Sequence, residues 1–268
     1  MAYFLHRATS ILLYAARASV APDSPAAGTP ESAGPADPNL IEDLVAANRI
    51  LADQGVLDGY GHVSVRHPGN PERYLLSRSL APELVTAGDI MEFDLDSIPA
   101  DQRGRTMYLE RFIHGEIYKA RPEVNAVVHS HSPAVVPFSV SSVALKPIYH
   151  MSAFLHRGVP VFEIREAAGM TDLLVRDPKL GRALALSLGD KPVALMRGHG
   201  NVTVGSSIPF AVYYAIYTEV NARLQLQAIS LGGSVNYIAP EEGKLYEPNI
   251  AGTINRPWEL WKKKALRK

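Results

Sequence analysis

The sequence predicts an α/β fold in which helices cover both faces of a mixed β-sheet. Three observations support this class. Predicted strands and helices alternate along the chain, but without the regular strand–helix–strand rhythm of a doubly wound fold. The chain has no glycine-rich dinucleotide fingerprint and no internal repeat. Its 268 residues, of which 47% are hydrophobic and 20% charged, are enough for one large domain with a substantial core.

Residues 1–38 are predicted to be a disordered or loosely packed extension. Residues 1–20 contain Arg7 and Arg17, a short apolar stretch and no acidic residue, which is typical of a weak targeting segment. However, Arg17 interrupts the apolar region, and no convincing cleavage site follows. Residues 21–38 are rich in Pro, Ala, Gly and Ser and cannot bury a core. We therefore expect a single folded domain that covers residues 39–268.

The first half of this domain is predicted to contain one helix and three strands. Asn39 can cap a helix that runs to about Gln54 and stops at Gly55. The following segments are a strand over 59–66, a turn over 68–71, a strand over 73–77, a short helix over 82–86 and a strand over 90–95. The strands on either side of the 68–71 turn form a predicted hairpin.

The second half alternates further helices and strands. A helix is predicted over 109–120, where apolar residues recur at helical spacing and Glu110 lies in the first turn. A buried strand over 124–131 follows, and then a strand over 159–164. Asp177 can cap a helix through about Leu188. A hairpin with His199 at its turn comes next, and Ser206, Ser207 and Pro209 begin a long helix that ends at 232–233.

The composition limits the classes of function. The 27 basic and 27 acidic residues give a net charge of zero, so a nucleic-acid partner is not favoured. No apolar run reaches the roughly 18 to 20 residues of a membrane span, so we expect no membrane insertion. The absence of cysteine excludes disulfides and leaves His, Asp and Glu as the strong metal ligands. It also suits a reducing compartment, and we expect a cytoplasmic protein.

Four side chains are candidates for a mononuclear metal site. His129 and His131 are two residues apart on a predicted strand, so they share one face and can converge on an ion. His199 at its glycine-flanked turn and Glu110 would complete one carboxylate and three histidines. Three neutral imidazoles leave the full charge of the ion available to polarise a substrate oxygen. Alternatively, the histidines are hydrogen-bonded core residues, and Glu110 is a solvated carboxylate favoured by the helix dipole.

The ordered set of Glu110, Ala120-Arg-Pro-Glu-Val-Asn-Ala-Val-Val-His129-Ser-His131 and Gly198-His199-Gly200 resembles the class II aldolase/adducin family over residues 39–233. That family includes fuculose-phosphate and rhamnulose-phosphate aldolases, ribulose-phosphate 4-epimerase and several non-sugar decarboxylases. The resemblance implies a three-layer α/β/α sandwich with a mixed, largely antiparallel central sheet. It also implies a homotetramer with each active site at a subunit interface.

The same resemblance assigns roles to individual residues. His129, His131 and His199 match the ligands of one divalent metal ion per subunit, which could be Zn, Mn, Fe or Co. Glu110 matches a catalytic acid/base that can also touch the metal. A neighbouring subunit often contributes an aromatic residue in this family, and Tyr217 is the candidate. The alternative for Tyr217 is plain packing within a helix.

Departures from the sugar-phosphate members point to a different substrate. Those members carry small phosphate-binding residues in three segments. The corresponding segments here are Gly61-His62-Val-Ser64, Leu76-Ser77-Arg78-Ser79 and Tyr108-Leu109-Glu110. Bulky or cationic groups have replaced the small ones, so a phosphorylated sugar is disfavoured. Arg78 offers a fork that matches a carboxylate, unless it is merely a surface residue. His62, Tyr108 and Ser77 are the other predicted substrate-binding residues.

This pattern resembles the decarboxylase branch, such as hydroxy-methylpyridine-dicarboxylate decarboxylase. The expected function is a metal-dependent carbon–carbon lyase that decarboxylates a hydroxylated aromatic or heteroaromatic carboxylic acid. Loss of CO₂ would leave a metal-stabilised enolate or carbanion, which Glu110 or a water that it positions would protonate.

Three alternatives remain open: an aldolase acting on a small non-phosphorylated carbonyl compound, an Fe(II)- and O₂-dependent oxygenase of an aromatic acid, and a non-catalytic adducin-like module. Two further features also have two readings. His150 and His156 either line the pocket or are structural histidines. The tail over 258–264 either packs on a neighbour or caps the site, or it is a solvated helix end.

Overall fold

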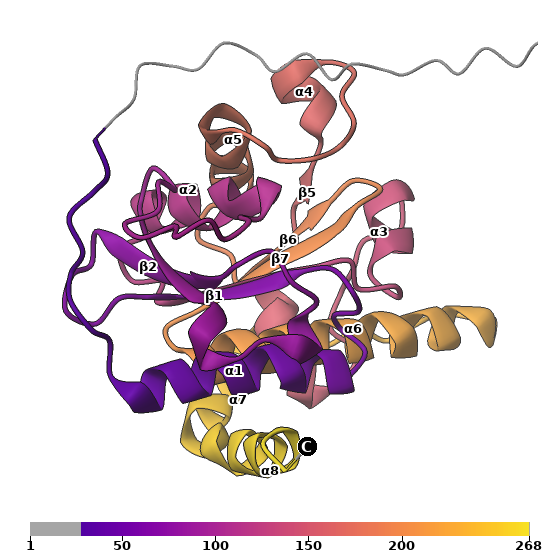
Figure 1. Cartoon of the computed structure of the whole chain (residues 1–268). Helices are drawn as coiled ribbons and strands as arrows, with labels where there is room; N and C mark the ends of the chain where they lie inside the picture. The colour runs from indigo at the N-terminus through magenta and orange to yellow at the C-terminus, as the bar shows by residue number, and fades with distance from the viewer. Residues whose placement is uncertain (1–27, 268) are drawn as a thin grey trace, which may run out of the picture.

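The computed structural model describes residues 28–267 and contains one seven-stranded sheet (Figure 1). The strands are β1 (His62–Arg66), β2 (Arg73–Ser77), β3 (Ile90–Asp94), β4 (Ala126–Ser130), β5 (Val161–Phe162), β6 (Val193–Met196) and β7 (Gly200–Gly205). Their order across the sheet is β3-β2-β1-β4-β7-β6-β5. Only the β5–β6 pair is parallel, and all other neighbours are antiparallel. The predicted mixed, largely antiparallel sheet is confirmed.

Helices cover both faces of this sheet, which confirms the three layers. The α-helices are α1 (Pro38–Asp53), α2 (Phe112–Ala120), α3 (Val136–Val140), α4 (Ile164–Ala168), α5 (Pro178–Leu188), α6 (Ile208–Ser230), α7 (Pro240–Thr253) and α8 (Asn255–Ala265). The 3₁₀ turns are η1 (Pro82–Leu84), η2 (Ala87–Asp89), η3 (Leu109–Arg111) and η4 (His150–Arg157). One face packs against α2 and α5, and the other packs against α1, α6 and α8 (Figure 1).

Strand β4 shows how the sequence pattern produces this arrangement. Val127 belongs to the core on the α2 and α5 side, whereas Ala126 and Val128 belong to the core on the α1 and α6 side. Successive side chains on a strand alternate between faces, and both faces are buried here, so the strand is a continuous apolar run. By the same alternation, His129 lies on the face covered by α2.

Several element boundaries differ from the predictions. The cap of α1 is Asp37, whose carboxylate accepts from the Asn39 amide at 2.9 Å, because Pro38 needs no hydrogen-bond acceptor at the first helical position. The predicted 109–120 helix is divided, since Glu110 adopts φ −90° and ψ 19° in η3 before α2 begins. The predicted 159–164 strand is reduced to β5, after which the Glu163 side chain caps α4.

The cap at Asp177 is confirmed, because its carboxylate accepts from the Leu180 amide at 2.8 Å. The hairpin of β6 and β7 also forms as predicted, with His199 in its turn. The long helix, α6, begins immediately after Ser207. None of the helices described between residues 28 and 267 combines the length and the apolarity that a bilayer crossing requires.

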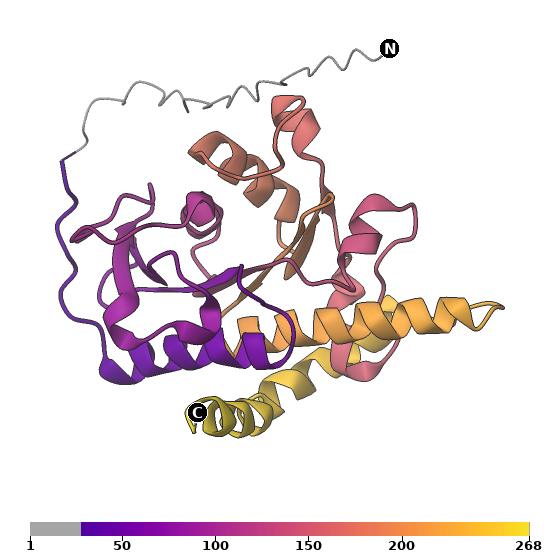
Figure 2. The ribbon, with the colours of Figure 1, turned by 45° about the vertical axis from the view of Figure 1, so that its right-hand side comes forward.

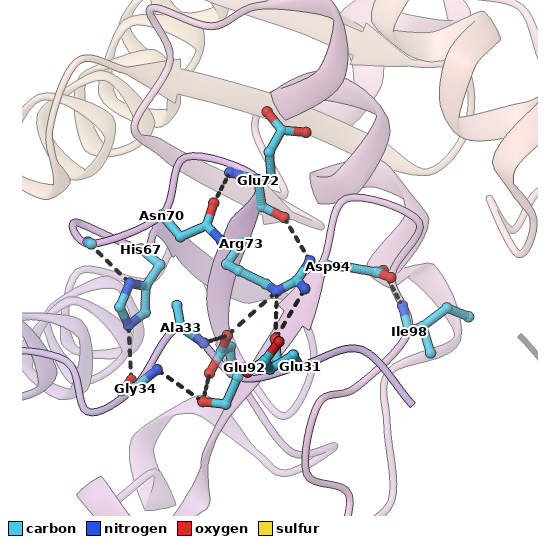
Figure 3. A network of polar contacts seen from close by, with 12 residues as sticks. Glu31, Ala33, Gly34, His67, Asn70, Glu72, Arg73, Glu92, Asp94 and Ile98 are labelled. Carbon is cyan, nitrogen blue, oxygen red and sulfur yellow. Dashed lines mark hydrogen bonds and ion pairs between the residues drawn. The ribbon is translucent and has the colours of Figure 1, made fainter. Parts of the chain in front are cut away.

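Part of the predicted extension is hydrogen-bonded to the edge of the sheet (Figure 3). The Ser32 hydroxyl and the Ala33 amide donate to the Glu92 carboxylate at 2.6 and 2.7 Å. The Arg73 guanidinium donates to the Glu31 carbonyl at 3.0 and 3.1 Å. The attached chain thus begins before the predicted boundary at residue 39. The weak targeting segment considered for residues 1–20 lies outside the described residues.

The C-terminal tail packs on its own chain. Figure 2 shows α8 below α1 and α6, on the side of the sheet away from α2 and α5, with α7 leading down to it. Trp258 of α8 is buried in the core with α1 and α6. The Lys262 ammonium lies 2.7 Å from both Glu42 and Asp43 of α1. The tail is therefore an integral part of this layer rather than a solvated helix end.

Candidate metal centre

The structure brings the four predicted metal-site residues together. One ligand atom from each of Glu110, His129, His131 and His199 lies within 4.8 Å of all the others. The Glu110 Oε2 atom is 3.4 Å from the Nε2 atoms of both His129 and His199. The Nε2 atoms of His131 and His199 are 3.0 Å apart. These distances suit side chains that converge on one small cation.

Strand pairing places the histidines. His129 is on β4 opposite Val202 of β7, and His131 lies just beyond the end of β4. The β6–β7 turn presents His199 beside them. This approach requires glycine at position 200, because a Cβ there would overlap the Ser130 carbonyl oxygen and lie 2.9 Å from the His131 Cα.

An unpaired buried nitrogen indicates that the cluster fits a metal ion. His129 Nε2 is buried and has no hydrogen-bond partner in the part of the chain that the structure describes, although Glu110 is near. Its Nδ1 lies 3.2 Å from the Asn201 carbonyl oxygen, and His199 Nδ1 lies 3.1 Å from the Leu173 carbonyl oxygen. Donation from Nδ1 to a carbonyl leaves the Nε2 lone pair free for a metal. A buried polar atom without a partner is otherwise costly.

Electrostatics favour an anionic Glu110 in this cluster. Burial alone would raise the pKa of Glu110, but the adjacent His129 and His199 hold it well below its usual range. The Val175 amide also donates to Oε1 at 2.9 Å. Burial, together with the two neighbouring histidines, lowers the pKa of His131 to about 4. Binding of a divalent cation needs the ionised carboxylate and neutral imidazoles. It would therefore displace any proton on His199, whose pKa is raised because its contact with Glu110 outweighs the opposing effect of burial.

A pocket of about 530 Å³ opens onto this cluster. The predicted residues His62 and Tyr108 line it together with Glu110, His129 and His131. The lining residues that the sequence did not single out as substrate contacts are Gly59, Tyr60, Gly61, Ser79, Leu80, Ala81, Leu109 and Leu174. Among residues 28–267, the lining thus contains aromatic and aliphatic groups and neither lysine nor arginine.

Three predicted substrate-binding residues have polar groups that contact other parts of the protein. The Arg78 guanidinium donates to Asp89 at 2.6 Å, and Arg78 is absent from the pocket lining. Its fork is matched to a carboxylate as predicted, but that carboxylate belongs to the protein. The Tyr108 hydroxyl donates to the Leu80 carbonyl at 2.6 Å, while Ser77 lies 3.3 Å from that hydroxyl and outside the lining. Tyr108 therefore offers its ring to the pocket.

The remaining candidates lie apart from this pocket. Tyr217 packs among the aromatic side chains of α6 and α8 and does not line the pocket of its own chain. His150 packs against Tyr246 at 5.0 Å between ring centroids. His156 Nε2 lies 3.1 Å from the Glu247 carboxylate. Neither histidine lines the pocket of its own chain among residues 28–267.

Sequence reasoning missed a buried polar chain behind the pocket wall. Tyr118 of α2 connects through Ser64 to His114 of the same helix, and His114 contacts His62 directly, with neighbouring atoms 2.6 to 2.7 Å apart. Helical spacing did contain a signal, because residues 110, 114 and 118 recur every four positions on one face of the predicted helix. His62 and Ser64 similarly share one face of β1.

Residues 42–226 match the family described as Class II Aldolase and Adducin N-terminal domain. Decarboxylase tropJ of Talaromyces stipitatus is 38% identical over 244 residues, which cover 82% of this chain and 92% of that protein. The 3,4-dihydroxyphthalate decarboxylase of Arthrobacter keyseri is 33% identical over 231 residues, which cover 80% and 88%. The solved structure of L-fuculose 1-phosphate aldolase from Glaciozyma antarctica PI12 aligns with a TM-score of 0.70 and 28% identity, covering 84% and 88%.

Proposed function

The chain belongs to the class II aldolase and adducin family, and from this premise we propose that it is a metal-dependent decarboxylase of a hydroxylated aromatic or heteroaromatic carboxylic acid. The observation that carries the proposal is the cluster of Glu110, His129, His131 and His199 at the base of a pocket lined by aromatic and aliphatic groups. The similarity to decarboxylases over about four fifths of the chain supports the reaction type.

The pocket supports an aromatic substrate rather than a sugar phosphate. Its lining contains the rings of Tyr60, His62 and Tyr108, which can stack on a flat ring. Within the described part of the chain, the lining contains no lysine or arginine to balance a phosphate dianion. The volume of about 530 Å³ is within the range of pockets that bind small organic molecules.

The donor set suits Zn, Mn, Fe or Co, since it consists of three imidazoles and one carboxylate without a thiolate. A divalent ion held there supplies a Lewis acid that polarises a substrate oxygen.

The side chains of the protein then account for the remaining steps. The apolar walls orient the ring and exclude water from the breaking bond. The bond between the ring carbon and the carboxyl carbon breaks and CO₂ leaves. The electron pair of this bond remains on the ring carbon. Glu110 starts as a carboxylate, so it, or a water that it positions, accepts the proton that the substrate hydroxyl loses and delivers that proton to the ring carbon, which leaves the product as a phenolate.

Assembly is also part of the proposal. Tyr60 and Leu109 line the pocket, yet 69% and 59% of their surfaces are exposed in the single chain. Exposed apolar groups at a pocket mouth favour cover by a second subunit, and we infer a homotetramer with interfacial sites, to which Tyr217 of a neighbouring chain contributes. Light scattering after size-exclusion chromatography measures the mass.

The absence of cysteine supports a cytoplasmic location.

Elemental analysis paired with CO₂ release from a panel of hydroxylated benzoates, phthalates and pyridine carboxylates tests the function. We expect about one metal ion per chain, little metal in His129→Ala, and loss of CO₂ release in Glu110→Gln. His156→Gln is the matched control, because His156 lies outside the cluster and should leave both readings unchanged. A protein that binds no metal would refute the proposal, as would one that releases no CO₂ from any panel member. Consumption of O₂ during turnover would instead identify an oxygenase.

A further inference from the structure

Four buried side chains form a continuous hydrogen-bond chain that ends at the pocket. The Tyr118 hydroxyl is 2.7 Å from Ser64 Oγ, Ser64 Oγ is 2.6 Å from His114 Nδ1, and His114 Nε2 is 2.6 Å from His62 Nδ1. None of the four residues is more than 3% exposed. We call Tyr118, Ser64, His114 and His62 the His62 relay.

Two secondary-structure elements hold the relay in register. His114 and Tyr118 are one turn apart on the face of α2 that packs on the sheet, and His62 and Ser64 point from β1 to that face. The relay is therefore fixed by backbone geometry, and each of its side chains contacts the next one directly.

The positions of the protons along the relay follow from its Tyr118 end, where the hydroxyl has a single acceptor among residues 28–267. Ser64 Oγ is the one hydrogen-bond acceptor found for the Tyr118 hydroxyl among residues 28–267, so a buried phenol must donate to it. The Ser64 hydroxyl then has His114 Nδ1 as its remaining partner and donates to that atom. Burial lowers the pKa of His114 to about 3, so the ring is neutral and carries its proton on Nε2.

The direction continues into the pocket wall. His114 Nε2–H donates to His62 Nδ1, which must be unprotonated, so the proton of the His62 ring is on Nε2. His62 lines the pocket, its ring lies 5.1 Å from that of His129, and Tyr108 holds its other side at 4.4 Å. Since Nδ1 is occupied by the relay, Nε2 is the atom that remains for a bound molecule.

We propose that the His62 relay fixes His62 as a directional N–H donor, and that this N–H binds an anionic oxygen of the substrate, either a carboxylate or a phenolate, beside the metal ligands. No lysine or arginine between residues 28 and 267 lines the pocket for this task, and Arg78 is engaged by Asp89. A donor with a fixed tautomer recognises an oxygen anion and disfavours a group that can only donate. Tyr118, Ser64 and His114 are positioning residues in this scheme. The inference rests on the proposed function for the identity of the substrate.

The tautomer is tested first by long-range ¹H–¹⁵N NMR on the full chain labelled at histidine, with and without added zinc. We expect His62 to carry its proton on Nε2 in the wild type. Tyr118→Phe removes the hydroxyl that sets the direction of the relay, so a second population of His62 with the proton on Nδ1 should appear. Tyr74→Phe is the matched control, because it removes a buried hydroxyl next to Tyr118 that bonds to Ser97 and is not part of the relay.

Binding is then measured by calorimetry with two probes, each of which carries one of the two candidate oxygen groups. Benzoate has only the carboxylate, and catechol has only the hydroxyls. His62→Phe should weaken one of them by about 10- to 100-fold, since a hydrogen bond to a charged group is lost. The probe whose binding is weakened identifies the oxygen that His62 binds. His62→Gln keeps an N–H donor and should restore most of the affinity.

An Nδ1–H tautomer of His62 in the wild type would overturn the inference. Equal binding of both probes by the wild type and His62→Phe, with unchanged melting temperature, would overturn it as well. Neither measurement needs turnover, so the relay is supported if both results hold even where CO₂ release fails. In that case only the proposed function is refuted.

Discussion

Gly200→Ala tests whether the close approach of the β6–β7 turn to β4 assembles the metal site. Gly200 follows His199 directly, and its Cα faces Ser130 and His131 across the strand pair. A Cβ at this position would overlap the Ser130 carbonyl oxygen. Because the obstacle is the backbone of Ser130 and His131, no side-chain rotation can relieve the overlap.

The structure sets the magnitude of the effect. The added Cβ would lie 2.9 Å from the His131 Cα, about 0.5 Å inside the 3.4 Å at which ordinary van der Waals contact begins. Metal–ligand distances tolerate only about 0.2 Å. We therefore expect His131 and His199 to separate, with a loss of about 1–3 kcal/mol in the free energy of unfolding of the metal-free protein. Zinc affinity should fall roughly 10- to 100-fold.

Urea unfolding in the presence of a chelator measures the first quantity, and calorimetric titration of zinc into the metal-free protein measures the second. Gly252→Ala is the control, because Gly252 lies in α7 with no atom within 4 Å of an added Cβ. Alanine there should be neutral or stabilise by about 0.5–1 kcal/mol. If Gly200→Ala binds zinc as tightly as the wild type, the proposed role of this approach is incorrect.

Three further predictions follow from the site. Tyr108→Phe leaves the Leu80 carbonyl without its hydroxyl donor, so the free energy of unfolding in urea titrations should fall by about 1 kcal/mol. The affinity for benzoate should stay within about twofold of the wild-type value. A large loss of affinity would show that the Tyr108 hydroxyl binds the ligand. Arg78→Ala breaks the pair with Asp89 at a partly exposed position, so the stability cost should be below about 1 kcal/mol and KM should be unchanged in steady-state assays. A raised KM would restore Arg78 as a substrate anchor. Burial lowers the pKa of His114 to about 3, so between about pH 6.5 and pH 3 the unfolded chain binds one more proton at this residue than the folded chain does. This residue should therefore reduce the free energy of unfolding by about 1.4 kcal/mol for each unit that the pH falls within this range. Urea midpoints measured at pH 7 and pH 5 should differ less in His114→Gln than in the wild type, and an equal difference would contradict the assignment.

The sequence was sufficient where a local pattern determines the structure. Apolar residues on both faces of the 124–131 segment require a strand buried on two sides, and its period of two places His129 and His131 on one face. Asp177 caps its helix because the acceptor lies three residues before the amide that it satisfies. The ligand types of the proposed metal site also follow from the sequence, since a chain without cysteine leaves His, Asp and Glu as the strong ligands.

Only the tertiary structure decided which side chains are free to meet a ligand. The fork of Arg78 is visible in the sequence, but the carboxylate that it contacts is Asp89, eleven positions away in η2. The direction of the His62 relay likewise depends on Tyr118, which α2 places beside Ser64 of β1. Periodicity reports the face on which a residue lies, whereas hydrogen bonds and ion pairs depend on distances of about 3 Å between residues far apart in the chain. Packing of the layers fixes those distances.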